Sequence, residues 1–211
     1  MLHGVAQKAL RLAASLALAA LIILCLAWEL WLAPLRPGGS FNSVSTAAGA
    51  SPGGTFTRTN LVAFSPTTGV ISSFAPAING AVWALATDGT WLYVGGTFTS
   101  VNGVARRGVA KLDPVTGAVD TTFNAGFSSG QVTEAAVVAG RLLVGGTFPG
   151  KLRALNLATG ANTGYINVAI TGTVADNAGP TEVYRFAVNP AGTRLVGVGN
   201  FTSVGGQTRW R

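Results

Sequence analysis

The chain has 211 residues, of which 29 are glycines, 48% are apolar and only 10% are charged. The length allows one ordinary domain or at most two small ones, and the charged share is far below the roughly one quarter of an average globular protein. The formal net charge is +7, and the only histidine, His3, precedes a long apolar run. The rest of the chain therefore lacks an imidazole for a Ser/His/Asp triad or a zinc site, which excludes the usual hydrolytic and zinc chemistries.

Residues 12–35, LAASLALAALIILCLAWELWLAPL, form an apolar run whose only charged side chain is Glu29. A helix of about 20 residues crosses a bilayer, so this run predicts a transmembrane helix or signal anchor. Lys8 and Arg11 precede it and only one arginine follows closely, which places the N-terminus inside by the positive-inside rule. We therefore expect a cytoplasmic stub at residues 1–11 and a single-pass protein of a bacterial inner membrane, with the rest of the chain outside.

A cleaved signal peptide is the alternative interpretation of this run, and it predicts a secreted protein. The sequence Ala48-Gly49-Ala50 has the form of a cleavage site but lies well beyond the apolar residues. A lipoprotein is disfavoured because Leu24 stands before Cys25, where a small residue is needed. Cys25 is also the only cysteine, so no disulfide forms within the chain. Either interpretation exports the remainder.

The residues CLAWELWLAPLRPGGS, Cys25 to Ser40, resemble the first membrane helix of a family of small proteobacterial inner-membrane proteins of unknown function. Members of that family continue with further apolar helices, whereas this chain turns into a Gly/Ser/Ala linker at residues 36–54. A natural fusion, a gene-model error and an assembly chimera would each produce this junction, and the sequence leaves all three open.

Three repeated landmarks predict the fold of residues 55–211. The first is a GG-x-F phrase, with spacings of 42, 50 and 53 residues between Phe56, Phe98, Phe148 and Phe201. The second is a turn that ends in Thr-Gly, at residues 66–69, 114–117 and 157–160. The third is an alternating strand that begins near Ala81, Val132 and Val183. The common order of the three landmarks indicates a repeat of roughly 40 to 50 residues.

Each unit is expected to hold four short strands. In the clearest unit Asp88-Gly89 is a hairpin signal, and the Gly-Gly pair marks a bulge or a close backbone approach. The phenylalanine after the glycines is expected to fill the core between neighbouring sheets. Four-stranded units of this length are typical of propeller blades. The predicted fold is therefore all-β, a partial β-propeller of about three four-stranded blades preceded by one N-terminal transmembrane helix.

The stretch VGGTFTSVNGVARRGVAKLDPVTGAVDTTFN, Val94 to Asn124, resembles the delta-60 class of bacterial β-propeller repeats. The resemblance covers residues 55–211 and implies the fold, but it implies no particular ligand or activity. Two units depart from the pattern, since the hairpin loop that follows Phe98 is missing after Phe56 and Phe148. The last unit matches FTSVNGVARRG and then stops, so we expect an incomplete ring, either a fragment or a unit completed by further blades or copies.

The residues beyond the linker predict no catalytic, cofactor-binding or metal site. The carboxylates are interpreted as turn and strand-edge residues; they are Asp88, Asp113, Asp120, Glu134, Asp176 and Glu182. From Phe41 onward the chain has 11 lysines and arginines against 6 carboxylates, and the cations are dispersed. This pattern indicates a solvated surface and not a nucleic-acid interface. Three arginines align in the repeat and are expected to share a structural role: Arg58, Arg106 and Arg209.

Aromatic side chains on the predicted strands allow a carbohydrate-stacking surface, although alternating strands more often pack such rings in the core or between blades. These residues are Trp83, Trp91, Tyr93, Tyr184 and Trp210. The sequence Asn200-Phe201-Thr202 fits the N-glycosylation pattern, and its place inside the repeated phrase favours a structural role for Asn200.

Together these observations predict a non-catalytic extracytoplasmic binding or scaffold module of a membrane-anchored or secreted β-propeller protein. It contacts the membrane through the N-terminal helix, and a protein or carbohydrate ligand is left open. No cofactor and no nucleic acid is expected. One alternative is the remnant of a propeller oxidoreductase or lyase that uses a quinone or a metal. Another is a chimeric gene product without function.

Overall fold

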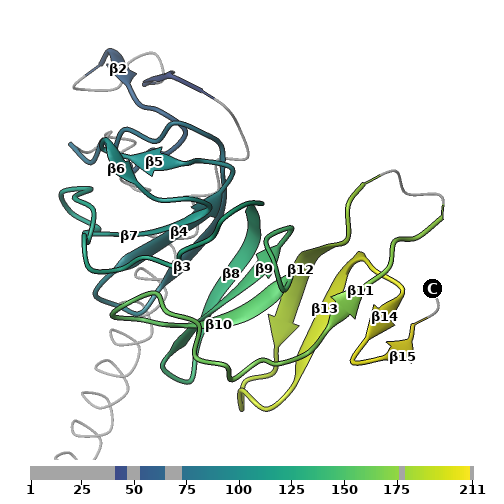
Figure 1. Ribbon diagram of the computed structural model, residues 1–211. Helices are drawn as coiled ribbons and strands as arrows, with labels where there is room; N and C mark the ends of the chain where they lie inside the picture. The colour runs from purple at the N-terminus through teal and green to yellow at the C-terminus, as the bar shows by residue number, and fades with distance from the viewer. Residues whose placement is uncertain (1–40, 47–52, 65–72, 176–178, 210–211) are drawn as a thin grey trace, which may run out of the picture.

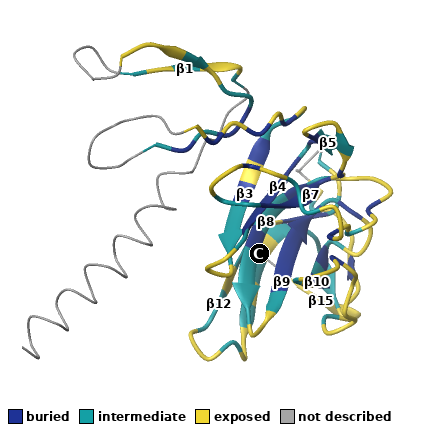
Figure 2. Ribbon diagram, turned by 90° about the vertical axis from the view of Figure 1, so that its left-hand side faces the viewer, coloured by how far each residue is buried: buried dark blue, intermediate teal, exposed yellow. Residues whose placement is uncertain are grey.

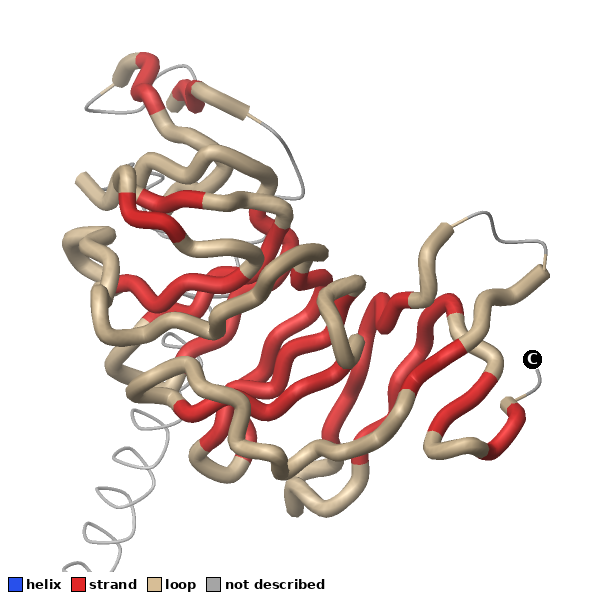
Figure 3. Tube along the Cα trace, in the orientation of Figure 1, coloured by secondary structure: helices blue, strands red, loops and turns tan. Residues whose placement is uncertain are grey.

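The computed structural model describes residues 41–46, 53–64, 73–175 and 179–209. Within these ranges every regular element is a β-strand, which confirms the all-β prediction (Figure 3). The predicted helix at residues 12–35 lies outside the described residues. In the part that is described, no helix is long and apolar enough to cross a membrane. The small sheets follow one another in chain order as a curved row (Figure 1).

The first sheet is antiparallel, in the order β3-β4-β7. Its strands are β3 (Val82–Thr87), β4 (Leu92–Gly96) and β7 (Val109–Leu112). The predicted hairpin signal lies between β3 and β4: the Asp88 side chain accepts the N–H groups of Thr90 and Trp91, and Gly89 has a φ of 91°. A small hairpin of β5 (Ser100–Val101) and β6 (Val104–Ala105) connects β4 to β7.

The second sheet repeats this arrangement in the order β8-β9-β10. Its strands are β8 (Val132–Val138), β9 (Arg141–Gly146) and β10 (Leu152–Asn156). The counterpart of the β5–β6 hairpin is absent here, because a tight turn with Lys151 N–H bonded to the Phe148 carbonyl leads directly into β10. This confirms the short connection predicted after Phe148.

The third sheet has two strands within the described residues, β12 (Glu182–Val188) and β13 (Leu195–Asn200). The segment after β13 forms a hairpin of β14 (Ser203–Val204) and β15 (Gln207–Thr208), and β14 also pairs with β11 (Ile170–Thr171). This hairpin corresponds to β5–β6, as the match between FTSVGGQTR and FTSVNGVAR predicts.

The prediction of four strands per unit is wrong for the described sheets. In the first two sheets the fourth segment pairs through one isolated bridge, Leu112 with Val119 and Leu155 with Asn162. In the first sheet the cause is local. The Asp120 side chain accepts the N–H of Thr122, which turns the chain away from the ladder. Each full sheet is therefore three strands with a short fourth edge.

The Gly-Gly phrase has the predicted role of allowing a bulge. Register shifts lie opposite the glycines at the same place in all three sheets, between Val82 and Ala84 in the first. A Cβ on Gly96 would overlap the carbonyl oxygen of Ala81, and the equivalent glycines Gly146 and Gly199 face the same obstruction. The second glycine of the phrase is thus required by backbone contact.

The first copy of the phrase lies elsewhere than predicted. The carbonyl of Phe98 accepts the N–H of Gly108. Its counterpart is Phe41, whose carbonyl accepts the N–H of Asn60. Strands β1 (Ser43–Ser45) and β2 (Thr55–Thr57) pair as β5 and β6 do, although β1 falls within the predicted linker. The prediction that Phe56 corresponds to Phe98 is therefore wrong. The match was hidden because a longer connection separates the two strands of this hairpin.

Three apolar clusters hold the row together. The first lies between the first sheet and the residues that precede it, Leu61, Ala63, Phe74 and Ile78, and the second and third lie between successive sheets. Phe98 and Phe148 are 1% and 0% exposed, as predicted, and Phe148 stacks on Phe127 with ring centroids 4.4 Å apart. Buried residues concentrate in the first two sheets, whereas β12 is largely half-buried or exposed (Figure 2).

Candidate functional site: the interfaces between sheets

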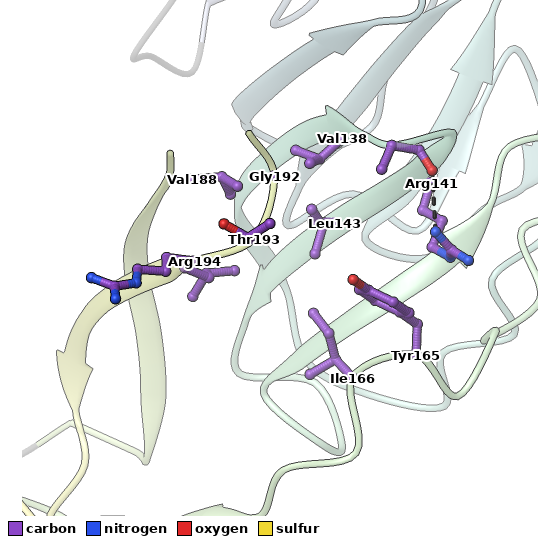
Figure 4. Close-up of a pocket in the computed structure, with 11 residues that line it drawn as sticks. Val138, Arg141, Leu143, Tyr165, Ile166, Val188, Gly192, Thr193 and Arg194 are labelled. Carbon is purple, nitrogen blue, oxygen red and sulfur yellow. Dashed lines mark hydrogen bonds between the residues drawn. The ribbon is translucent and has the colours of Figure 1, made fainter. Parts of the chain in front are cut away.

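A cleft of about 120 Å³ opens between the second and third sheets, where the β8–β9 and β12–β13 hairpins turn. Its walls are largely apolar and come from β8, β9, β12, the β12–β13 turn, β13 and the segment after β10 (Figure 4). The residues used below are Arg141, Leu143, Tyr165, Ile166, Val188, Arg194 and Leu195. Tyr165 is exposed and Arg141 half-buried, so the cleft is open to solvent.

The charged groups at this cleft are arginines. The Arg141 guanidinium lies over the Tyr165 ring, 4.3 Å from its centroid, and donates a hydrogen bond of 3.1 Å to the Ala139 carbonyl. Arg194 also lines the cleft, from the β12–β13 turn, and its guanidinium points away from the other lining side chains (Figure 4). Among the described residues, neither Arg141 nor Arg194 forms an ion pair with a carboxylate. The potential at the cleft is therefore positive.

We call the contact between the first and second sheets the first interface, and the contact between the second and third sheets the second interface. The cleft exists because smaller side chains in the second interface replace two aromatic rings of the first. Strand pairing aligns Leu143 with Tyr93. Tyr93 follows Leu92, which pairs with Leu112 of β7, and Leu143 follows Leu142, which pairs with the equivalent leucine of β10, Leu155. Ile166 aligns with Phe123, since each lies four residues after the bridge of its sheet. Tyr93 and Phe123 meet edge to face with centroids 5.6 Å apart. Smaller side chains at both positions leave the space empty.

The same place in the first interface holds a polar network. The Tyr93 hydroxyl donates to Asp88, with an oxygen–oxygen distance of 2.9 Å, and lies 3.2 Å from the Leu157 carbonyl oxygen. Nearby, Lys111 Nζ is 2.8 Å from Asp120 Oδ2, and both side chains are nearly buried. Lys111 also lies over the Trp91 ring at 4.4 Å. Every polar member of this network thus has a partner.

Ionisation in the network follows from these contacts. Burial opposes the charge of Asp120, but hydrogen bonds from Lys111 and Thr122 outweigh it and hold the pKa of Asp120 well below its usual range. The pKa of Asp88 is also lowered, because backbone N–H groups and Tyr93 overcome its desolvation. Burial, with the hydrogen bond to Asp88, raises the pKa of Tyr93. At neutral pH the tyrosine therefore stays a donor to an ionised aspartate.

In the second interface, apolar or neutral residues stand at the positions equivalent to this polar network. These residues are Val138, Leu143, Ala154 and Thr163. Two carboxylates lie at this interface: Glu134, which pairs with Arg185, and Glu182 at the other end of β12, which is 7% exposed. Burial raises the pKa of Glu182, and Gln131 and Lys151 offset this effect only in part. The pKa of Glu182 is thus shifted in the opposite direction to the pKa values of Asp88 and Asp120.

A family model matches residues 86–123, which span the end of β3, all of β4 to β7 and the turn that follows. The family is described as a domain of unknown function (DUF5122) beta-propeller. These residues form a β-propeller repeat. No curated protein matches the chain. The second sheet, beyond the matched residues, has its bulge, glycines and turn at equivalent positions.

The predicted turn of the repeat is present in both full sheets. Asp113 accepts the N–H groups of Val115 and Thr116, and Asn156 takes the same role in the second sheet. These backbone hydrogen bonds lower the pKa of Asp113. Glu134 forms an ion pair with Arg185, and Asp176 lies outside the described residues. No group of three His, Cys, Asp or Glu side chains that could hold a metal ion occurs in the described part of the chain.

The three aligned arginines share a structural role, as predicted. The backbone N–H groups of Arg58, Arg106 and Arg209 bond to the equivalent carbonyls of their hairpins, and each guanidinium bonds to the carbonyl of the residue before it. Arg106 also donates to the carbonyls of Asp120 and Thr121. It therefore ties the β5–β6 hairpin to the fourth edge of its sheet.

The predicted aromatic surface divides into different environments. Tyr93 is fully buried and Trp91 packs with Lys111, whereas Trp83 and Tyr184 are 40% and 38% exposed at the bulge of their sheets. Trp210 lies outside the described residues. The predicted structural role of Asn200 is confirmed, since it is fully buried and bonds to the backbone of Val174, Gly179 and Pro180.

The third sheet also exposes the face that its predecessors bury. Val132 packs on Gly95, where a Cβ would lie 2.6 Å from its methyl carbon, and Val183 packs on Gly145 in the same way. Strand pairing places Val198 at the position of these glycines. Val198 is 57% exposed and Val196 is 69% exposed, although the counterparts of Val196 are buried.

Sequence reasoning did not single out the cleft or this open face. Arg141 and Arg194 were interpreted only as dispersed cations. The available signal was a comparison of repeat positions, in which Tyr93 becomes Leu143 and the glycine of the phrase becomes Val198. Residue-by-residue alignment of the units would have found both changes.

Proposed function

We propose that the chain is a non-catalytic binding or scaffold module built from delta-60-type blades of a β-propeller, held outside a bacterial inner membrane by the helix at residues 12–35. The observation that carries the proposal is the open face of the third sheet, defined by Val196 and Val198. Equivalent faces of the first two sheets are each covered by the next sheet. A face of this kind functions by contact with another blade.

The expected occupant is a further propeller blade. Its first strand would lie against β12 as β8 lies against β3 and β12 against β8. The residue of that blade at the place of Val132 and Val183 must be small, because Val198 already occupies the space that a glycine leaves in the first two sheets. The module is therefore selective for the blade that completes it.

The non-catalytic part of the proposal is supported by the roles of the carboxylates. Asp88 and Asp113 accept backbone N–H groups that shape turns, and Asp120 neutralises a nearly buried lysine. Each of these groups is held in its ionised state by fold-forming hydrogen bonds. Such carboxylates are poor proton donors at neutral pH.

The test compares the full chain with the double variant Val196→Glu, Val198→Glu in mild detergent, by light scattering after size-exclusion chromatography. In the absence of the completing blade, we expect the natural chain to self-associate through the exposed valines of this face and the variant to be smaller, because charges on the face oppose apolar contact. Val115→Glu is the matched control, since Val115 is 70% exposed in a turn. Equal association of the natural chain and the double variant would contradict the proposal.

The export part of the proposal has its own test. Alkaline phosphatase, which is active only outside the cytoplasm, is fused after Arg211 and assayed in whole bacterial cells. Activity that is lost on deletion of residues 12–35 supports export by this segment. An inactive but intact fusion protein would exclude it.

A further inference from the structure

We propose that the cleft between the second and third sheets binds a small aromatic carboxylate with a single ring. The proposal goes beyond the scaffold role and does not depend on the open face. It is based on the shape of the cleft, on its charge, and on what fills the same space in the first interface.

The size and walls of the cleft suit one ring. Its volume of about 120 Å³ is close to the roughly 150 Å³ of engineered apolar cavities that take up benzene. The walls include Leu143, Ile166, Val188 and Leu195, and the Tyr165 ring closes one side (Figure 4). A single ring fills this volume, whereas a fused ring system or a folded peptide segment would extend beyond it into solvent.

The first interface shows what this space accommodates. There the Tyr93 and Phe123 rings occupy the positions of Leu143 and Ile166 and pack against each other. The backbone around both places is equivalent, because the strand pairing is the same. A bound ring would therefore restore in the second interface the aromatic packing that the chain supplies for itself in the first.

The charges of the cleft select an anion. Arg141 lies beside the Tyr165 ring at the cleft, Arg194 lines it from the β12–β13 turn, and no carboxylate of the described residues pairs with either. The Arg141 guanidinium uses one hydrogen bond and one ring face inside the protein, which leaves N–H groups for a ligand. A carboxylate beside a guanidinium forms charge-assisted hydrogen bonds, which are about twice as strong as neutral ones.

The binding test uses benzoate as the probe and the full chain in mild detergent, with saturation-transfer NMR and titration. We expect saturable binding of benzoate and about tenfold weaker binding of benzamide, which keeps the ring and loses the charge. Affinity for benzamide equal to that for benzoate would overturn the role of the arginines. Absence of saturation up to about 10 mM benzoate would overturn the site.

Variants locate the binding. Arg141→Gln is expected to weaken benzoate binding about tenfold, whereas Arg107→Gln, which removes the same charge from an exposed position outside the cleft, leaves it unchanged. Leu143→Tyr is expected to abolish binding by filling the cleft as Tyr93 fills its counterpart. If that variant does not fold, Ile166→Phe fills the cleft from the segment after β10. Benzoate binding that survives in a folded cleft-filling variant would overturn the proposal.

Discussion

The two interfaces of this chain are built on the same backbone and hold different side chains. In both, a valine of the following sheet packs on the first glycine of the repeated phrase, and the second glycine lies against a carbonyl. Near the hairpin turns the first interface holds Tyr93, bonded to Asp88, and an ion pair, whereas the second leaves a cleft. The contact of this valine with the first glycine is therefore common to both interfaces, whereas the positions near the hairpin turns differ.

The largest expected effect tests the core of the first interface. Phe148→Ala should lower the free energy of unfolding by about 3–5 kcal/mol, because a fully buried ring is lost from a packed cluster. Phe201→Ala, at the equivalent position, should cost less than half as much because this ring is only half-buried. Chemical unfolding of the full chain measures both. Equal losses would show that the second interface is as tightly packed as the first.

The next effect concerns the ion pair. Asp120→Asn should cost about 3 kcal/mol at neutral pH, because it leaves the nearly buried Lys111 without its countercharge. The lowered pKa of Asp120 means that its ionised form stabilises the fold above the pKa of the unfolded chain. This stabilisation is lost as the pH falls below about 4. The variant should therefore show a smaller loss of stability between neutral pH and pH 3 than the natural chain.

Glu182 provides a control in which the pH dependence of stability has the opposite sign. Its pKa is raised in the fold, so the neutral form is favoured and stabilisation present at low pH is lost as the pH rises through that pKa. Glu182→Gln should therefore unfold at a higher temperature than the natural chain at neutral pH, and the difference should shrink in acid. A constant difference across pH would contradict the assignment.

A smaller effect tests the glycine contact. Gly96→Ala should cost roughly 1–3 kcal/mol, because its Cβ would overlap the Ala81 carbonyl and force β3 and β4 apart. Gly197→Ala is the matched control on β13, where a Cβ would meet the Arg185 carbonyl oxygen only at 3.8 Å. Thermal melts that show the same shift for both variants would refute a special requirement at the phrase.

The smallest expected effect is a gain in stability. Leu143→Tyr with Ile166→Phe should raise the free energy of unfolding by about 1 kcal/mol, because two rings bury additional apolar surface in the cleft. Arg141→Gln is the comparison that leaves the cleft unfilled. A loss of stability in the double variant would show that the second interface cannot adopt the packing of the first.

Much of the fold could be predicted because it depends on backbone chemistry that short patterns reveal. Asp88-Gly89 specified a hairpin, and the Gly-Gly phrase specified a bulge. Phe41 was missed as the first phrase copy because its partner strand follows a longer connection, so the pattern was interrupted. The fourth strand was overestimated because Asp120 bonds to its own backbone and turns the chain.

The cleft was harder to predict because it results from the absence of two aromatic rings that the first interface contains. Leu143 and Ile166 are ordinary core residues by type, and they create a cleft only relative to the larger rings at equivalent positions. The pairing of Lys111 on β7 with Asp120, next to the isolated bridge of Leu112 with Val119, likewise requires the register of the sheet. Composition and motif spacing carry no information on such differences in volume.

The burial of Asn200 has a practical consequence for production of the protein. The side chain is enclosed by the backbone of residues 174, 179 and 180, so a sugar transferase cannot reach it once the third sheet has formed. In a eukaryotic secretory host, a glycan added to the nascent Asn200-Phe201-Thr202 would take the place of these hydrogen bonds and block the sheet. Bacterial hosts without this modification are therefore the suitable source. In any other host, the backbone around Asn200 must fold before the transferase reaches this side chain.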